Sequence, residues 1–136
     1  MEISFSEKKR MDKNELKALY EDAEWFAYTQ DLVLLETALA HSLYVLSAWD
    51  GSKLAGLVRV VGDGLTIIYI QDILILKSHQ NRGIATELIA QVMDRYKTVR
   101  QKVLLTEEAP DVRHFYEKNG FQSCDSGELV AFAKMS

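Results

Sequence analysis

The chain has 136 residues, a formal net charge of −4 and 48% hydrophobic residues, which predicts one domain over residues 1–136 and excludes disordered and fibrous classes. The negative charge argues against nucleic-acid binding, and one cysteine with three scattered histidines argues against a disulfide or a metal site. The charged amino terminus and the lack of an apolar run of roughly 18 residues predict a cytoplasmic protein that binds no membrane.

The amino-terminal part of the chain predicts a short strand and two helices. Apolar and polar residues alternate around Ile3 to Phe5, as in a strand with one buried face. Asp12 has the features of a helix N-cap, and apolar residues follow it at helical spacing. Thr29 and Asp31 are candidate caps for a second helix that should end near His41.

The middle of the chain predicts three antiparallel strands. Apolar runs cover Leu43 to Trp49, Leu54 to Val61 and Leu65 to Leu76. Asp50-Gly51 separates the first two runs, and Asp-Gly between apolar runs is a strong hairpin signal because such turns need positive φ.

The remaining elements alternate between helix and strand. A helix is expected from Gly83 to Tyr96, a buried strand from Lys102 to Thr106, and a helix that Asp111 caps and that runs through Lys118. A last hairpin is expected from two runs, Phe121 to Cys124 and Leu129 to Lys134. This order predicts an α+β fold with a mixed sheet.

Between the long apolar run and the next helix lies a glycine-containing loop, Gln80-Asn81-Arg82-Gly83-Ile84-Ala85-Thr86. Glycine lets a ligand approach the main chain, and the unpaired N–H groups of a first helical turn attract phosphate. The alternative is an ordinary glycine turn that opens a helix.

In this loop the chain resembles the GNAT superfamily of acetyl-CoA-dependent N-acetyltransferases. Their pyrophosphate motif, Q/R-x-x-G-x-G/A, is matched by Gln80, Gly83 and Ala85. A second signature of the family, aromatic-Tyr-Glu-Lys-x-Gly-Phe, is matched by Phe115 to Phe121. The resemblance implies the GNAT acyl-CoA N-acyltransferase fold, with about seven mostly antiparallel strands and about four helices.

The resemblance also implies acetyl-CoA as cosubstrate, with no metal. It assigns the cofactor contacts to Ile73, Leu74, Ile75, Gln80, Asn81, Arg82, Gly83, Ile84, Ala85, Thr86, Phe115 and Lys118. The strand would pair with the pantetheine arm, and the loop amides would hold the pyrophosphate. For Arg82 and Lys118 the alternative is a solvated surface charge, and for Phe115 it is a core ring.

Two residues are candidates for proton transfer. By its position in the family signature, Tyr116 would be the general acid that protonates the CoA thiolate, and the alternative is a core tyrosine. Asp72 is the candidate base, being the carboxylate nearest in sequence to the expected reaction centre. It is alternatively a buried acceptor for neighbouring backbone, with Tyr69 or Gln71 ordering a water in its place. His79 is expected at the surface.

Aromatic residues before the cofactor motif are the candidates for acceptor binding, namely Trp25, Phe26 and Tyr28, with Tyr69 on the long strand. The alternative is that the first three rings only cover the core between two helices.

The resemblance therefore implies an N-acetyltransferase that passes acetyl from acetyl-CoA directly to a primary amine, expected to be a small molecule. Direct transfer is expected because the single cysteine, Cys124, lies outside the motifs. Two alternatives stay open: a non-catalytic module that binds acyl-CoA, and an acetyltransferase that acts on a protein or peptide. A homodimer is possible.

Overall fold

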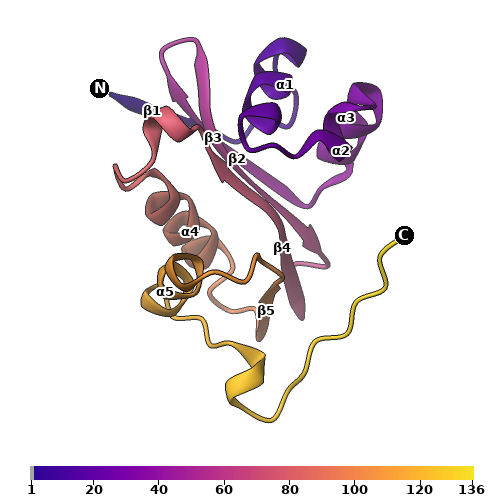
Figure 1. Cartoon of the computed structure of the whole chain (residues 1–136), viewed down its shortest axis with the longest axis vertical. Helices are drawn as coiled ribbons and strands as arrows, with labels where there is room; N and C mark the ends of the chain where they lie inside the picture. Colours follow the sequence, from indigo (N-terminus) through magenta and orange to yellow (C-terminus); the bar gives the residue numbers. More distant parts are fainter. Residues whose placement is uncertain (1) are drawn as a thin grey trace. The chain divides into compact units, whose positions relative to one another are not determined.

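The computed structural model describes residues 2–136 (Figure 1). By their internal contacts these residues form two compact units, one that ends at Leu105 and one that begins at Thr106. The first unit contains β1 (Ile3–Ser6), α1 (Lys13–Asp22), α2 (Phe26–Thr29), α3 (Leu32–His41), β2 (Tyr44–Asp50), β3 (Lys53–Gly62), β4 (Ile67–Ile75), the 3-10 helix η1 (Lys77–His79), α4 (Ile84–Arg95) and β5 (Gln101–Leu104). The second contains α5 (Pro110–Lys118) and the 3-10 helix η2 (Cys124–Ser126).

The five strands form one mixed sheet in the order β1-β2-β3-β4-β5. Neighbouring strands are antiparallel except for β4 and β5, which are parallel. Gly51 has φ 61° in the β2–β3 turn, as the Asp-Gly signal predicts. The mixed α+β sheet is therefore confirmed, although five α-helices are present because the one-turn α2 was not expected.

Helices cover both faces of the sheet in the first unit (Figure 1). The side chain of Asp12 accepts the amides of Asn14 and Glu15 at the start of α1, and Asp31 accepts the amide of Leu34 at the start of α3. These two predicted caps are confirmed. Apolar side chains of α1 and α3 pack against the sheet in a cluster of Leu16, Leu19, Tyr20, Leu35, Leu39, Val45, Leu54, Ala55, Leu57, Leu74 and Leu76.

The long strand β4 begins later than its apolar run. Asp63 accepts the amides of Leu65 and Thr66 at 2.8 Å and that of Ile67 at 3.1 Å, so its carboxylate holds these residues in a turn. These bonds and one from the Thr66 hydroxyl hold the pKa of Asp63 well below its usual range. The ladder consequently starts at Ile67.

Two irregularities of β4 shape one place in the sheet. β5 accompanies β4 only from Ile67 to Ile70, so within the described chain the rest of β4 has no strand on that side. On the other side, Ile70 pairs with Val60 and Asp72 pairs with Arg59, which leaves Gln71 without an opposite residue. Gln71 is therefore a β-bulge at the point where β5 ends, and bulges often redirect side chains next to functional sites.

The second unit is built around α5. Ala109 is its N-cap and Pro110 its first residue, so the expectation that Asp111 caps this helix is wrong by two residues. Proline fits the first position because its missing N–H would be unpaired anyway. The helix ends at Lys118, and Gly120 in the turn that follows has a φ of 92°, which glycine reaches readily. The amide of Phe121 donates to the carbonyl of Tyr116 at 3.0 Å and closes the end of the helix.

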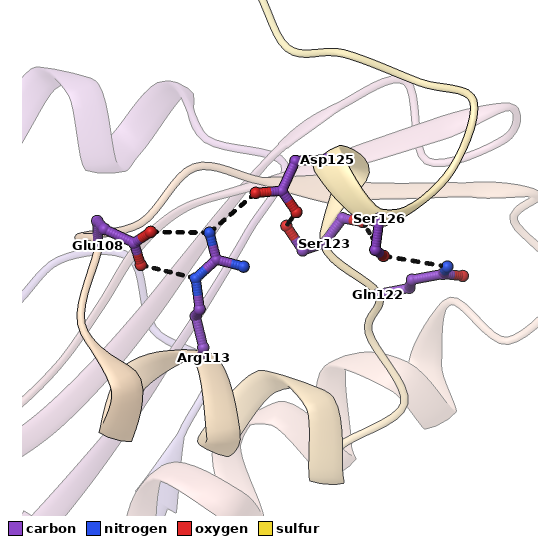
Figure 2. Close-up of polar contacts among 6 residues, drawn as sticks. All are labelled: Glu108, Arg113, Gln122, Ser123, Asp125 and Ser126. Carbon is purple, nitrogen blue, oxygen red and sulfur yellow. Dashed lines mark hydrogen bonds and ion pairs between the residues drawn. The ribbon is translucent and has the colours of Figure 1, made fainter.

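The predicted terminal hairpin is wrong, since neither Phe121 to Cys124 nor Leu129 to Lys134 forms a strand. Short polar side chains bend the chain instead: Ser123 donates to Asp125 at 2.5 Å, and Ser126 donates to the Ser123 carbonyl at 2.8 Å (Figure 2). Such bonds compete with strand ladders, and here they build η2. The sheet therefore has five strands where about seven were expected.

An ion-pair network supports this turn (Figure 2). Arg113 on α5 donates to both oxygens of Glu108, at 2.6 and 2.8 Å, and to Asp125 at 3.0 Å. The paired arginine lowers the pKa of both carboxyl groups. Glu108 is thus ion-paired with α5. Within residues 2–136 no helix has the length and apolar character needed to cross a bilayer.

Candidate functional site

The loop before α4 presents backbone N–H groups. Gly83 is the N-cap of α4 with φ 81°, and no side chain caps this end. The first bond of the helix runs from the Glu87 amide to the Gly83 carbonyl at 3.0 Å, which leaves the amides of the first turn without a partner in the helix. A Cβ at Gly83 would meet nothing within 4 Å. Open amides at the positive end of a helix suit a phosphate group.

The side chains of this loop divide into buried and exposed ones. Ile84 is buried, so only its backbone can meet a ligand, whereas Asn81, Arg82 and Thr86 are exposed. Asn81 also has positive φ, 62°, and two left-handed residues in one turn help to make a concave nest of amides. Gln80 donates to the carbonyl of Ile75 at 3.4 Å and ties the loop to the end of β4.

The segment before the loop is anchored from two directions. His79, expected at the surface, is only 7% exposed; its Nε2 lies 2.9 Å from Asp50, and Ser78 Oγ lies 2.7 Å from its Nδ1. The hydrogen bond with His79 lowers the pKa of Asp50. The amide of Lys77 donates to Asp22 at the end of α1, at 2.7 Å. These contacts hold the chain between β4 and α4 in place.

The end of β4 offers mainly backbone to a ligand. Leu74 is buried in the core on the α1 face, and Ile73 and Ile75 are half-buried. Gly56 lies opposite on β3, where a Cβ would come within 2.6 Å of the Ile75 side chain. Residues 73–75 of β4 therefore pack in the core through their side chains. Their backbone forms the strand edge that no other strand accompanies.

Next to that edge, Asp72 is the centre of a buried polar cluster, which we call the Asp72 cluster: Asp72, Arg59, Tyr20 and Tyr28. Asp72 is 2% exposed, and its Oδ2 accepts from Arg59 Nε at 2.7 Å and from the Tyr20 hydroxyl at 3.0 Å. Its Oδ1 accepts from the Tyr28 hydroxyl at 2.7 Å. Ser42 receives a further bond from Arg59 at 3.4 Å. A buried carboxylate is stable only with such partners.

Burial and the Asp72 charge determine the protonation of the two phenols. Burial raises the pKa of Tyr20, and the Asp72 charge raises it further. Burial also raises the pKa of Tyr28, while its hydrogen bond with Gln71 acts in the opposite direction. Burial alone would lower the pKa of Arg59, but Asp72 raises it above the usual value. At neutral pH the cluster therefore contains one ion pair and two neutral phenols.

The geometry favours the structural alternative for Asp72 over the role of base. Both oxygens accept hydrogen bonds, Arg59 balances the charge, and the side chain is only 2% exposed, so the carboxylate is largely closed to solvent. The hydrogen-bond partners of Asp72 are nevertheless side chains of distant segments, whereas the sequence suggested neighbouring backbone groups. Arg59 and Tyr20 have no signal in the local sequence, because each looks like an ordinary residue of an apolar strand or helix.

The end of α1 brings the aromatic residues together. Glu24 has φ 62°, its amide donates to the Glu21 carbonyl at 2.9 Å, and the amide of Trp25 donates to the Tyr20 carbonyl at 3.0 Å. This pattern is a Schellman motif, in which the residue after the left-handed one packs on the last helical turn. The Trp25 ring accordingly lies 6.0 Å from that of Tyr20, and the Tyr28 ring lies 5.2 Å from it.

Of the four predicted acceptor-binding residues, the structure thus brings two together, Trp25 and Tyr28. Phe26 is 51% exposed on α2. Tyr69 is half-buried on β4, opposite Val103 of β5.

In the second unit, Tyr116 lies between two aromatic rings, with Phe115 at 5.0 Å and Phe121 at 5.8 Å between centroids. Burial raises the pKa of Tyr116, and its hydrogen bond with Thr106 acts in the opposite direction. The phenol is therefore protonated at neutral pH and able to donate a proton. Lys118 Nζ lies 5.9 Å from the Phe115 ring centroid.

In residues 2–136 no three His, Cys, Asp or Glu side chains are grouped to hold a metal ion.

Comparison with known proteins assigns the family. Residues 8–133 match the acetyltransferase (GNAT) domain, although no curated protein sequence matches the chain. A GNAT-family acetyltransferase of Streptococcus pneumoniae TIGR4 has a TM-score of 0.86 and 28% identity, with 99% of this chain and 98% of that chain covered.

Two more distant structures share the fold. Ribosomal-protein-alanine N-acetyltransferase from Brucella melitensis biovar Abortus 2308 has a TM-score of 0.71 and 22% identity, over 97% of this chain and all of its own. AAC(6')-Iy, in complex with the bisubstrate analogue CoA-S-monomethyl-acetylneamine, has a TM-score of 0.67 and 17% identity, with 100% of both chains covered. Because the acetyltransferase (GNAT) domain matches residues 8–133, which is most of its length, the chain belongs to the GNAT acetyltransferase family.

Proposed function

We propose that the protein is an acetyl-CoA-dependent N-acetyltransferase that passes the acetyl group directly to a primary amine of a small molecule. The observation that carries this proposal is the open turn at Gly83, whose free amides begin α4 within a chain that matches the GNAT domain. The pyrophosphate of acetyl-CoA would bind these amides, with Gln80 and Arg82 beside it.

The unaccompanied edge of β4 is the proposed place of the pantetheine arm and the thioester. An extended ligand pairs with such an edge as an added strand would. A backbone N–H near Leu74 or Ile75 would then bond the thioester oxygen and stabilise the negative charge that forms on it during attack. The amine nitrogen forms the new bond to the acetyl carbon, and the bond from that carbon to sulfur breaks.

Two protons must move in this reaction. The attacking nitrogen loses one, and the CoA thiolate gains one as it leaves. For the second transfer we propose Tyr116, whose raised pKa keeps the phenol protonated at neutral pH. For the first, the engaged oxygens of Asp72 support a water, ordered by Tyr69 or Gln71, in preference to the carboxylate itself.

The nature of the acceptor is the open part of the proposal. The fold neighbours named above include a ribosomal-protein-alanine N-acetyltransferase and a protein bound to the bisubstrate analogue CoA-S-monomethyl-acetylneamine, so fold alone does not select an acceptor class. Aromatic rings packed at Trp25 and Tyr28 support a small molecule with an apolar body. The homodimer and the cytoplasmic location remain predictions from the sequence.

Release of CoA thiol from acetyl-CoA, measured with benzylamine, neamine and a short peptide that begins with alanine, tests the proposal. We expect turnover with at least one amine, and Tyr116→Phe should lower kcat by about 100-fold while the Kd for acetyl-CoA stays within about twofold. Tyr96→Phe is the matched control, because this half-buried phenol lies at the end of α4 and packs on Tyr44.

The outcomes separate the alternatives. A full rate in the Tyr116→Phe variant would remove the phenol from the mechanism and leave the transferase in place. Binding of acetyl-CoA without turnover of any amine would favour a non-catalytic acyl-CoA-binding module. Turnover of the peptide alone would favour a protein or peptide acetyltransferase.

A further inference from the structure

We infer that the phenol oxygen of Tyr28 receives the N–H of the acceptor amine, and that Asp72 serves this contact by holding the phenol in one direction. The inference rests on the proposed function and assigns the amine-binding atom within it. Tyr28 would thus contact the substrate, and Asp72 would be a positioning residue that acts through Tyr28.

The hydrogen bonds of Tyr28 give its oxygen a defined direction. The hydroxyl proton is donated to Asp72 Oδ1 at 2.7 Å, so the lone pairs of the oxygen are directed away from the carboxylate. Gln71 Nε2 already donates to this oxygen at 3.2 Å, and Gln71 is exposed. Tyr28 is half-buried, and the acceptor amine would take the place of the exposed Gln71 side chain as the N–H donor to its oxygen.

The position of this oxygen fits the reaction. Its partner Gln71 is the bulge residue of β4, directly after the last pair that β4 makes with β5, between Ile70 and Leu104. The unaccompanied edge begins at that residue, and the thioester is proposed to lie along it. An amine held at Tyr28 would thus be next to the strand edge that carries the acetyl group.

The charges of the cluster suit the form of the amine that attacks. Arg59 balances Asp72 at 2.7 Å, and the phenol stays neutral, so the buried groups behind Tyr28 carry no net charge. Glu24, four residues before Tyr28, is exposed and pairs with Lys77 at 3.5 Å. An uncharged acceptor oxygen beside the Trp25 ring favours a neutral primary amine on an apolar body over a polycation.

Tyr20 provides a matched control within the same cluster. It donates to the same carboxylate, at 3.0 Å, yet it is 0% exposed and has no access to a ligand. Phenylalanine at either position removes one hydroxyl and one bond to Asp72. Only the Tyr28 change also removes an atom that a substrate could contact.

The test measures kcat and KM for benzylamine, or for whichever of the three probes the natural chain acetylates fastest, in Tyr28→Phe and Tyr20→Phe. We expect Tyr28→Phe to raise the KM for the amine about tenfold, as loss of one hydrogen bond would, with kcat changed less than about threefold. Tyr20→Phe should lower the midpoint of thermal unfolding and leave the KM within about twofold. Both variants should keep the Kd for acetyl-CoA.

Equal changes of KM in the two variants, or an unchanged KM in Tyr28→Phe, would overturn the assignment of Tyr28 while the transferase proposal stands. A natural chain that acetylates none of the probes but binds acetyl-CoA would overturn the transferase proposal and this inference with it. A tenfold change confined to Tyr28→Phe supports both.

Discussion

The loop from Gln80 to Thr86 and the Asp72 cluster belong to the same unit and are built in opposite ways. The loop presents main-chain N–H groups at the exposed start of α4, and no side chain caps this helix end. The cluster consists of side chains from α1, α2, β3 and β4, whose polar atoms are paired with one another. The loop leaves backbone N–H groups open to a ligand, whereas the cluster uses its polar atoms in internal contacts, with the Tyr28 oxygen proposed to accept from a substrate as well.

This difference predicts different responses to mutation. A change in the loop should affect ligand affinity more than stability, because few native contacts depend on it. A change in the cluster should affect stability first, since within residues 2–136 every buried side-chain nitrogen or oxygen has a partner. Removing one partner leaves another buried group unpaired.

The largest expected effect is that of Asp72→Ala. The change leaves the buried guanidinium of Arg59 without its counter-ion, and breaking a buried pair in this way costs about 3–5 kcal/mol. Denaturant unfolding would show this loss as a lower midpoint. Glu36→Ala, which removes an exposed pair with Lys13, is the control and should cost less than about 1 kcal/mol. Similar losses in both variants would contradict the structural role of Asp72.

The smallest expected effect is that of Glu24→Gly. α1 and α5 end in the same Schellman motif, but the left-handed position is Glu24 in the first and Gly120 in the second. Because a left-handed conformation costs a non-glycine residue about 1–2 kcal/mol, part of which the greater freedom of unfolded glycine cancels, we expect a gain of about 0.5 kcal/mol.

The mirror change, Gly120→Ala, should lower the free energy of unfolding by about 1 kcal/mol. Denaturant unfolding of both variants measures the pair. A loss of stability in Glu24→Gly would mean that the Glu24 side chain contributes more than its strained backbone costs.

The sequence predicted what local chemistry determines. Asp12 and Asp31 cap their helices, and Gly83 opens α4, because each acts on residues within one turn of itself. The Asp72 cluster was beyond prediction, since it joins residues up to 52 positions apart through the packing of α1 and α2 on the sheet.

The terminal hairpin failed for a related reason. The apolar run after Leu129 looks like a strand, but the serine and aspartate side chains before it favour a tight local turn. Likewise, the positive φ of Glu24 has no signal in its residue type, although it places Trp25 against Tyr20. Residue types that favour one backbone conformation therefore allowed the local structure to be predicted. Residue types that tolerate several conformations did not.

The central claim, that the turn at Gly83 binds acetyl-CoA, is tested most directly by thermal unfolding with and without acetyl-CoA in the natural chain, in Gly83→Asp and in Gly51→Asp. The two glycines have similar φ, 81° and 61°, and open space around them, so both variants place the same added charge on a left-handed residue. At 100 times its Kd the ligand adds about 2.7 kcal/mol of stability, which should raise the midpoint by several degrees. We predict this rise in the natural chain and in Gly51→Asp, and its loss in Gly83→Asp; an equal rise in all three proteins would contradict the account.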